Sequence, residues 1–196
     1  LPMTFLHGSC RELPEAFCVG DDNYGGGYLL ASHLLQNGHK KIAGIFKSDD
    51  VQGPERYHGM VCAMRDAGLF PLDENVLWFS SFQRRQLVEL QDESLLQSFL
   101  RQQLGGCTAV VCYNDEIAFH LIRTLLRAGM RVPEDVAVVS FDNSYYSTFG
   151  PVSITSAGHA PHAMGSAAAE NLLSQIRRQP CRSISLPWTL FRRQSG

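Results

Sequence analysis

Two small polar residues stand at the ends of neighbouring apolar segments in the middle of the chain. Asn114 follows the apolar run 108–113, and Asp142 follows the run 136–141. One helix-like segment separates the runs, which predicts a right-handed crossover between parallel strands. Both strands then end at the same edge of the sheet, where open α/β sheets bind ligands. We therefore expect the Asn114 amide and the Asp142 carboxylate to lie together in a binding site.

Similar residues follow other predicted strands or lie just beyond their ends. The full set of candidates from these patterns is His7, Asp50, Gln52, Arg56, Phe82, Asn114 and Asp142. Carboxylates and amides pair with adjacent hydroxyl groups, and a guanidinium offers a fixed fork of donors. The flat apolar face of an aromatic ring can lie against C–H groups. This combination favours a small polyhydroxylated ligand.

Each candidate also has a simpler interpretation, and the sequence leaves both open. An aspartate or asparagine after a strand is often only the cap of the next helix. Arg56 lies in the first turn of a predicted helix and could be a solvated surface arginine. Phe82 could anchor its loop in the core instead of stacking on a ligand. Several such residues converging at one sheet edge favour a site.

Other kinds of chemistry have weaker support. Gly25–Gly27 opens a predicted helix, but no phosphate-binding motif accompanies it, so we attribute the glycines to a tight turn or close helix packing. His159 and His162 form the closest pair among the histidines and lack the spacing of metal ligands. No G-x-S-x-G motif is present, and Cys112 lies inside a predicted strand. We predict no metal, no cofactor and no catalytic residue.

The composition is that of a globular protein. The chain has 196 residues, with 44% hydrophobic and 18% charged residues and a formal net charge of −2. This charge gives no support for nucleic-acid binding by the segment itself. No apolar run approaches the ~18 residues of a membrane span, and no signal peptide is visible. The six cysteines form no C-x-x-C pair. We interpret them as buried or half-buried thiols of a reducing compartment, with a disulfide pair as the less favoured alternative.

Alternating strand and helix patterns predict an α/β fold with a parallel sheet covered by helices on both faces. We expect strands at 3–6, 17–19, 41–47, 75–79, 108–113, 136–141, 152–156 and 183–190. The last strand belongs at an edge because Pro187 interrupts it. Helices are expected at 28–36, 54–67, 87–104, 117–128 and 164–176.

Four segments resemble the lactose/galactose-repressor family of bacterial transcription regulators. They are NYGGG, HLL and GHKKIA within 23–43, RYHGM at 56–60, CYNDEIA at 112–118 and VPEDVAVVSFDN at 132–143. The resemblance spans nearly the whole chain. It implies a periplasmic-binding-protein-like effector domain of two lobes with a sugar in the cleft between them. Similarity to the arabinose-responsive branch implies L-arabinose. The implied contacts include Arg56, Asn114 and Asp142, and add His159 near a lobe crossing.

The resemblance has departures and a boundary. Ser140 stands where the family usually has glycine, and Asn143 where a second aspartate is common. The DNA-binding headpiece and the first half of the amino-terminal lobe have no counterpart here. We expect 1–20 and 158–180 to belong to an incomplete amino-terminal lobe, and 21–157 with 181–196 to a nearly complete carboxy-terminal lobe.

Three functions follow in order of support. The first is the effector-binding domain of a cytoplasmic repressor that forms a homodimer through 116–127 and 144–146, binds operator DNA only through the missing domain and touches no membrane. The second is an extracytoplasmic sugar-binding protein of an uptake system. The third is an enzyme that uses Asp142 or Asp50 as a base. An upstream helix-turn-helix favours the first, an upstream signal peptide the second, and turnover of a sugar the third.

Overall fold

The chain folds into two units, each with its own sheet. A computed structural model describes residues 1–7 and 16–196. The small unit contains 1–22 and 159–189, and the large unit contains 23–158 and 190–196. Cys10 lies outside the described residues. Within the described part of the chain, no helix is long and apolar enough to cross a membrane.

The large unit is built on a six-stranded sheet in the order β4-β3-β5-β6-β7-β9. Neighbouring strands from β4 to β7 pair in parallel. The strands are β3 (Ile42–Lys47), β4 (Val76–Phe79), β5 (Ala109–Cys112), β6 (Ala137–Phe141), β7 (Thr155–Gly158) and β9 (Thr189–Phe191). The parallel β5–β6 pair confirms the crossover predicted from the sequence.

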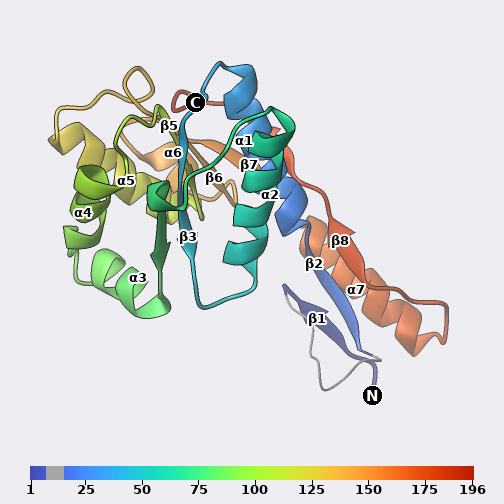
Figure 1. The fold of residues 1–196 in the computed structure, drawn as a ribbon. Coiled ribbons are helices and arrows are strands. Elements are labelled where there is room, and N and C mark those ends of the chain that lie inside the picture. Colours follow the sequence, from blue (N-terminus) through green and yellow to red (C-terminus); the bar gives the residue numbers. More distant parts are fainter. Residues whose placement is uncertain (8–15) are drawn as a thin grey trace. The chain divides into compact units, whose positions relative to one another are not determined.

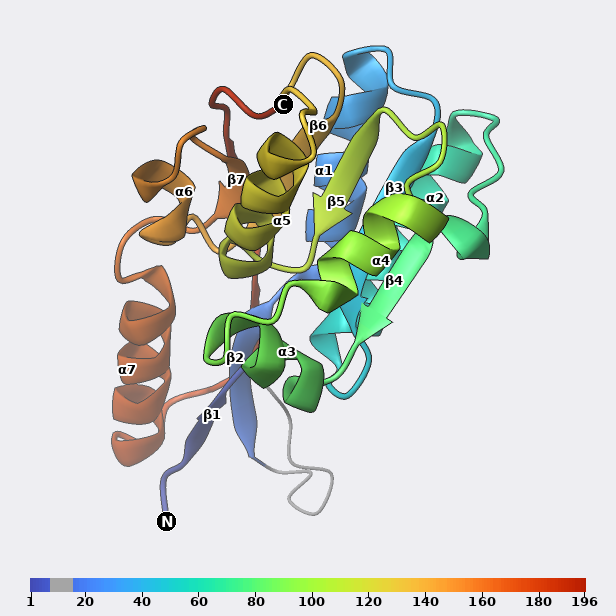
Figure 2. The same ribbon diagram turned by 90° about the vertical axis from the view of Figure 1, so that its left-hand side faces the viewer.

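Helices cover both faces of this sheet, as the alternating pattern predicts (Figures 1 and 2). Helices α1 (Asn23–Gln36) and α2 (Gln52–Asp66) pack against each other on one face. The other face carries α3 (Ser81–Val88), α4 (Ser94–Gln102) and α5 (Asp115–Arg127). Two short helical turns, η1 (Asp73–Asn75) and α6 (Tyr146–Phe149), complete the unit.

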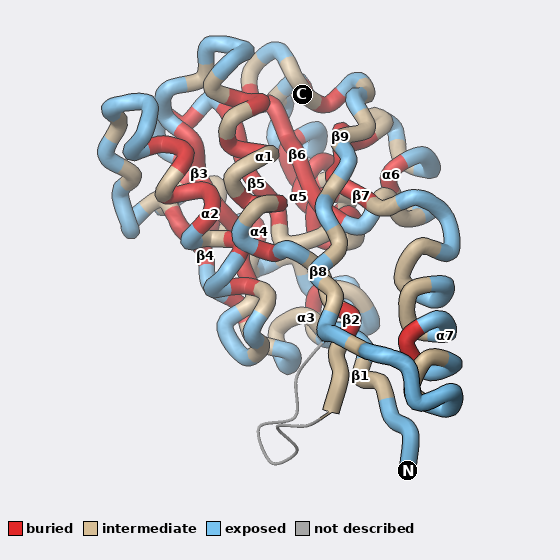
Figure 3. The backbone as a smooth tube through the Cα atoms, turned by 90° about the vertical axis from the view of Figure 1, so that its right-hand side faces the viewer, coloured by how far each residue is buried: buried red, intermediate tan, exposed pale blue. Residues whose placement is uncertain are grey.

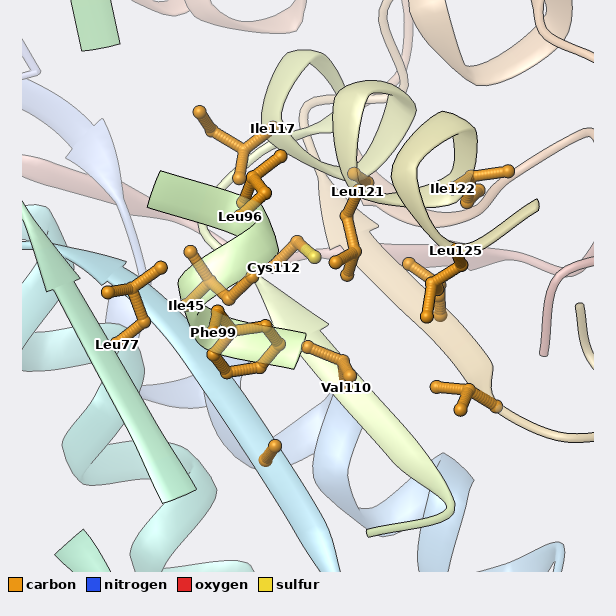
Figure 4. Close-up of a cluster of buried hydrophobic side chains, with 14 of the residues drawn as sticks. Ile45, Leu77, Leu96, Phe99, Val110, Cys112, Ile117, Leu121, Ile122 and Leu125 are labelled. Carbon is orange, nitrogen blue, oxygen red and sulfur yellow. The ribbon is translucent and has the colours of Figure 1, made fainter. Parts of the chain in front are cut away.

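The core of the large unit explains why its central strands read as continuous apolar runs. All residues of β5 and β6 are buried (Figure 3). A strand covered on both faces favours apolar side chains along its whole length. Figure 4 shows Val110 and Cys112 of β5 packed with Leu121 and Leu125 of α5 and Phe99 of α4.

The glycines at the start of α1 allow close packing, which confirms the interpretation from the sequence. A side chain at Gly27 would collide with the carbonyl oxygen of Arg56, in α2. In return, a side chain at Gly59 would collide with the backbone of Tyr24 and Tyr28, in α1. The two helices therefore meet backbone to backbone.

The small unit contains a three-stranded parallel sheet and one helix. The strands lie in the order β1-β2-β8, with β1 (Thr4–Leu6), β2 (Phe17–Asp21) and β8 (Ile184–Leu186). Helix α7 (Ala163–Ile176) packs against β1 and β2. The Asn171 side chain donates a hydrogen bond to the carbonyl of Arg182, which ties α7 to the segment before β8.

Three expected elements differ in the structure. The helix expected at 87–104 is two helices, α3 and α4, because the polar run Glu89–Glu93 interrupts it. The strand expected at 183–190 is split at Pro187 into β8 and β9, which lie at edges of different sheets. Consequently, residues 181–189 join the small unit, whereas we had expected them in the larger lobe. The strand expected at 152–156 begins three residues later, as β7.

Candidate functional site

Arg56 is buried among the strand ends of the large unit, which rules out the surface interpretation. Its side chain is 2% exposed. The guanidinium donates from Nε to Asn23 Oδ1 at 3.0 Å and from Nη1 to the carbonyl of Tyr113 at 2.5 Å. Nη2 lies 3.7 Å from Asp142 Oδ1. The same group lies over the Phe141 ring, 4.2 Å from its centroid. Arg56 thus connects the ends of β5 and β6.

Tyr113 organises a second part of this edge, and the sequence analysis missed it. Its hydroxyl lies 2.6 Å from Asp50 Oδ2 and 3.0 Å from Gln52 Oε1. Burial, and then the hydrogen bond to Asp50, raise the pKa of Tyr113, which keeps it a hydrogen-bond donor. Lys47 Nζ lies 3.2 Å from Asp50 Oδ2. The structure therefore brings Asp50 and Gln52 together through Tyr113.

Asn114 caps α5, and this half of the simpler interpretation is confirmed. Its Oδ1 accepts a hydrogen bond from the backbone N–H of Ile117 at 3.1 Å. Over residues 1–7 and 16–196, the amide Nδ2 has no hydrogen-bond partner in the structure. The cap fixes the side chain, and the amide nitrogen remains as a donor for a ligand.

Asp142 has an unusual backbone conformation at the end of β6. Its φ is 95°, a backbone conformation that residues other than glycine rarely adopt, and its side chain is 42% exposed. Such strain is characteristic of functional positions. Two hydrogen bonds fix the next residue. The backbone N–H of Asn143 donates to Ser156 Oγ, and Arg193 Nη2 donates to Asn143 Oδ1.

A buried carboxylate holds this loop in place. Asp115 is fully buried and accepts hydrogen bonds from the hydroxyls of Ser140, Ser144 and Ser156 and from the backbone N–H of Ser144. Burial raises the pKa of Asp115, although these hydrogen bonds oppose the shift. Ser140, where the resembling family usually has glycine, supplies one of the donors.

Phe82 lies in the first turn of α3, not in a loop as expected, and is 66% exposed. Several contacts fix the start of this helix. Ser80 and Gln83 form a capping box, and Asp49 accepts a hydrogen bond from the Ser81 N–H at 2.8 Å. Arg84 forms a bidentate ion pair with Glu116 of α5 at 2.7 and 2.8 Å. The ring is exposed on a fixed support, which contradicts the interpretation as a core anchor.

The two predicted histidines belong to the small unit, where one carboxylate joins them. His7 Nδ1 lies 3.0 Å from Asp21 Oδ2, and His159 Nε2 lies 2.8 Å from Asp21 Oδ1. Asp21 was not among the predicted site residues. Its position at the end of β2 could have identified it, but the adjacent Asp22 leaves open in the sequence which of the two aspartates ends the strand.

Other reactive groups give no second site among the described residues. Cys107 and Cys112 are buried, and Cys18, Cys62 and Cys181 are half-buried, which confirms the interpretation for these five. Burial raises the pKa of Cys112, so its thiol is inert. Within the described ranges, no cluster of three or more His, Cys, Asp or Glu residues could hold a metal ion.

Comparison with known proteins agrees with this architecture. Residues 31–196 match the family described as periplasmic binding protein-like domain. The chain belongs to the periplasmic binding protein-like domain family. This domain superimposes on a structure titled as a complex of the transcriptional regulator CelR with cellobiose, with a TM-score of 0.85 and 28% identity, over 100% of this chain and 59% of that one.

Curated relatives of the domain are transcriptional repressors. The arabinose metabolism transcriptional repressor of Halalkalibacterium halodurans is 31% identical over 91% of this chain and 46% of its own length. The repressor of the same name from Geobacillus stearothermophilus is 35% identical over 83% of this chain and 44% of its own length. The chain therefore spans about half the length of the curated relatives it matches. The fold class and the resemblance to the lactose/galactose-repressor family, both expected from the sequence, are confirmed.

Proposed function

We propose that this chain is the effector-binding part of a bacterial transcriptional repressor and that its effector is L-arabinose. The observation that carries the proposal is the group of polar side chains at the strand ends of the large unit. Arg56 joins the ends of β5 and β6 there, and Tyr113 joins Asp50 to Gln52. We call these polar residues, together with the aromatic Phe82, the strand-end rim: Asp50, Gln52, Arg56, Phe82, Asn114 and Asp142.

The chemistry of the strand-end rim suits a neutral sugar. Asp142 and Asp50 accept hydrogen bonds from hydroxyls, while Asn114 and Arg56 donate them. The fixed, exposed ring of Phe82 offers a surface for sugar C–H groups. The names of the two curated relatives support arabinose among the sugars. Contacts from His7 and His159 remain predictions.

The remaining features belong to the same proposal. We expect a cytoplasmic, non-enzymatic homodimer in which operator DNA is bound by another domain of the full-length protein. Effector binding would change the populations of two conformations and thereby the affinity for DNA. A sugar-binding protein of an uptake system is the second candidate, because it would use the same rim. Operator binding by the full-length protein that weakens on addition of sugar favours the repressor.

Calorimetry on the full-length protein with a panel of pentoses and hexoses tests the ligand. Arabinose should give saturable heat. The proposal for the ligand is wrong if another sugar binds and arabinose does not, and the proposed function is wrong if no sugar binds.

Two variants test the site. Arg56→Ala should weaken binding by roughly 2–3 kcal/mol, because charged hydrogen bonds are lost. Asp142→Asn tests the same rim at an exposed side chain, where the fold is not at risk. Arg85→Ala is the matched control, since the Arg85 side chain is 70% exposed and pairs with Glu89, four residues along the chain. Equal affinities in all three variants would remove Arg56 and Asp142 from the site.

A further inference from the structure

The chain passes between its two units at three places. These crossings are Asp22–Asn23, Gly158–His159 and Thr189–Leu190. On the small-unit side, each crossing is flanked by residues that contact the residues at the other two. They are Asp21 and Asp22 at the first, His159 at the second, and Pro187 and Trp188 at the third.

The contacts are direct and come from all three segments. His159 Nε2 lies 2.8 Å from Asp21 Oδ1, and His159 Nδ1 lies 2.9 Å from the Pro187 carbonyl oxygen. The Trp188 indole N–H donates to the carbonyl of Asp22 at 2.8 Å. The His159 and Trp188 rings are stacked, with centroids 4.2 Å apart and planes at 26°. One imidazole therefore touches both of the other crossings.

The chemistry of the two oxygens defines the role of the ring. A carboxylate and a peptide carbonyl are both acceptors, so each can accept a hydrogen bond from the ring nitrogen beside it. The Asp21 side chain is 3% exposed and that of His159 is 16% exposed, so water competes little for these bonds. The Trp188 indole covers one face of the imidazole.

Asp21 also serves a second imidazole. Its other oxygen lies 3.0 Å from His7 Nδ1, in the loop after β1. Both carboxylate oxygens of Asp21 thus lie beside histidines. The backbone carbonyl of Asp22 accepts the hydrogen bond from Trp188.

We infer that His159 is a positioning residue that fastens the three crossings to one another through Asp21, Pro187 and Trp188. Both ring nitrogens have partners within the small unit, so this role needs no bound effector. Joined in this way, the three connections respond to a change at any one of them as a single element. The inference does not depend on the identity of the effector.

Hydrogen exchange on the sugar-free protein tests this arrangement. His159→Gln can donate on one side only, so exchange should accelerate by about tenfold or more at all three segments, 19–24, 156–161 and 186–191. Asp21→Asn should give the same pattern. His162→Gln is the matched control, because His162 is exposed and lies three residues along the chain. The control should leave exchange unchanged.

A second measurement separates positioning from a general loss of stability. In ¹⁵N spectra of the native protein, Asp21→Asn should shift the signal of His159 Nε2, whereas His162→Gln should leave both ring nitrogens of His159 unchanged. Faster exchange confined to 156–161 would overturn the inference. So would unchanged exchange together with a loss of sugar affinity, which would show that His159 touches the effector as first predicted.

Discussion

Tyr113 contacts three of the residues that we predict to bind the effector. It was not itself predicted, because it stands one residue before Asn114, the polar residue at the end of the apolar run. Its hydroxyl contacts Asp50 and Gln52, and its carbonyl accepts a hydrogen bond from Arg56. Its ring packs edge-on against Phe79 with centroids 5.7 Å apart. One residue therefore contacts groups from α2, from β4 and from the turn between β3 and α2. If these residues bind the proposed effector, Tyr113 is expected to act through the positions it gives them.

Removal of the Tyr113 hydroxyl should weaken sugar binding. Tyr113→Phe keeps the ring in place and leaves Asp50 and Gln52 without their shared partner, so we expect affinity to fall about tenfold. Calorimetry with the preferred sugar measures the change. Tyr57→Phe is the matched control, because it also breaks a tyrosine–aspartate hydrogen bond, to Asp73 at 2.6 Å, but not one with the rim. Equal losses in both variants would contradict a specific role for Tyr113.

Sequence patterns predict which residues stand at strand ends but not which of them bond to each other. Asn114 and Asp142 were found because a polar residue abruptly ends an apolar run. Tyr113 was not, because it reads as the last residue of that run. The role of Asp115 has no signal in the sequence, because its partners Ser140 and Ser156 are distant along the chain. The positive φ of Asp142 has no signal in its residue type.

The contact between helices α1 and α2 depends on single glycines. Gly27→Ala forces a methyl group into the backbone of α2 at Arg56, and should destabilise the protein by about 1–3 kcal/mol. Gly165→Ala provides the opposite case, because nothing lies within 4 Å of a side chain there. It should stabilise α7 by about 0.5–1 kcal/mol. Urea unfolding of both variants measures the difference, and equal effects would show that α1 and α2 can move apart freely.

At the scale of elements, periodicity predicted the central βαβ unit and the helices on both faces, because burial determines those patterns. It failed where two elements share one continuous pattern. Leu87 and Leu96 both face the core, but from different helices, with Glu89–Glu93 between them. Likewise, 183–190 alternates like one strand, and only pairing with β2 assigns its first half to the small unit.

For the whole molecule, the exposed aromatic residues around α6 bear on the predicted homodimer. Tyr145 and Phe149 are 63% and 62% exposed, and their rings stack with centroids 4.7 Å apart. Tyr146 packs beside them against Phe119 of α5. This patch, defined by Tyr145, Tyr146 and Phe149, adjoins the helix that the family resemblance places at the dimer face. Large exposed apolar groups gathered on one surface are typical of protein interfaces.

The patch yields a prediction about assembly. In the full-length protein, the double substitution Tyr145→Ser with Phe149→Ser should weaken dimerisation by about tenfold or more, because aromatic anchors dominate interface energies. Sedimentation equilibrium measures the dissociation constant directly. Phe70→Ser is the control, since Phe70 is 87% exposed and lies after α2, outside the patch. A dimer that survives the double substitution but not Phe70→Ser would move the interface to the other side of the large unit's sheet. A monomeric unsubstituted protein would refute the homodimer itself, and control of DNA binding would then need a mechanism within one chain.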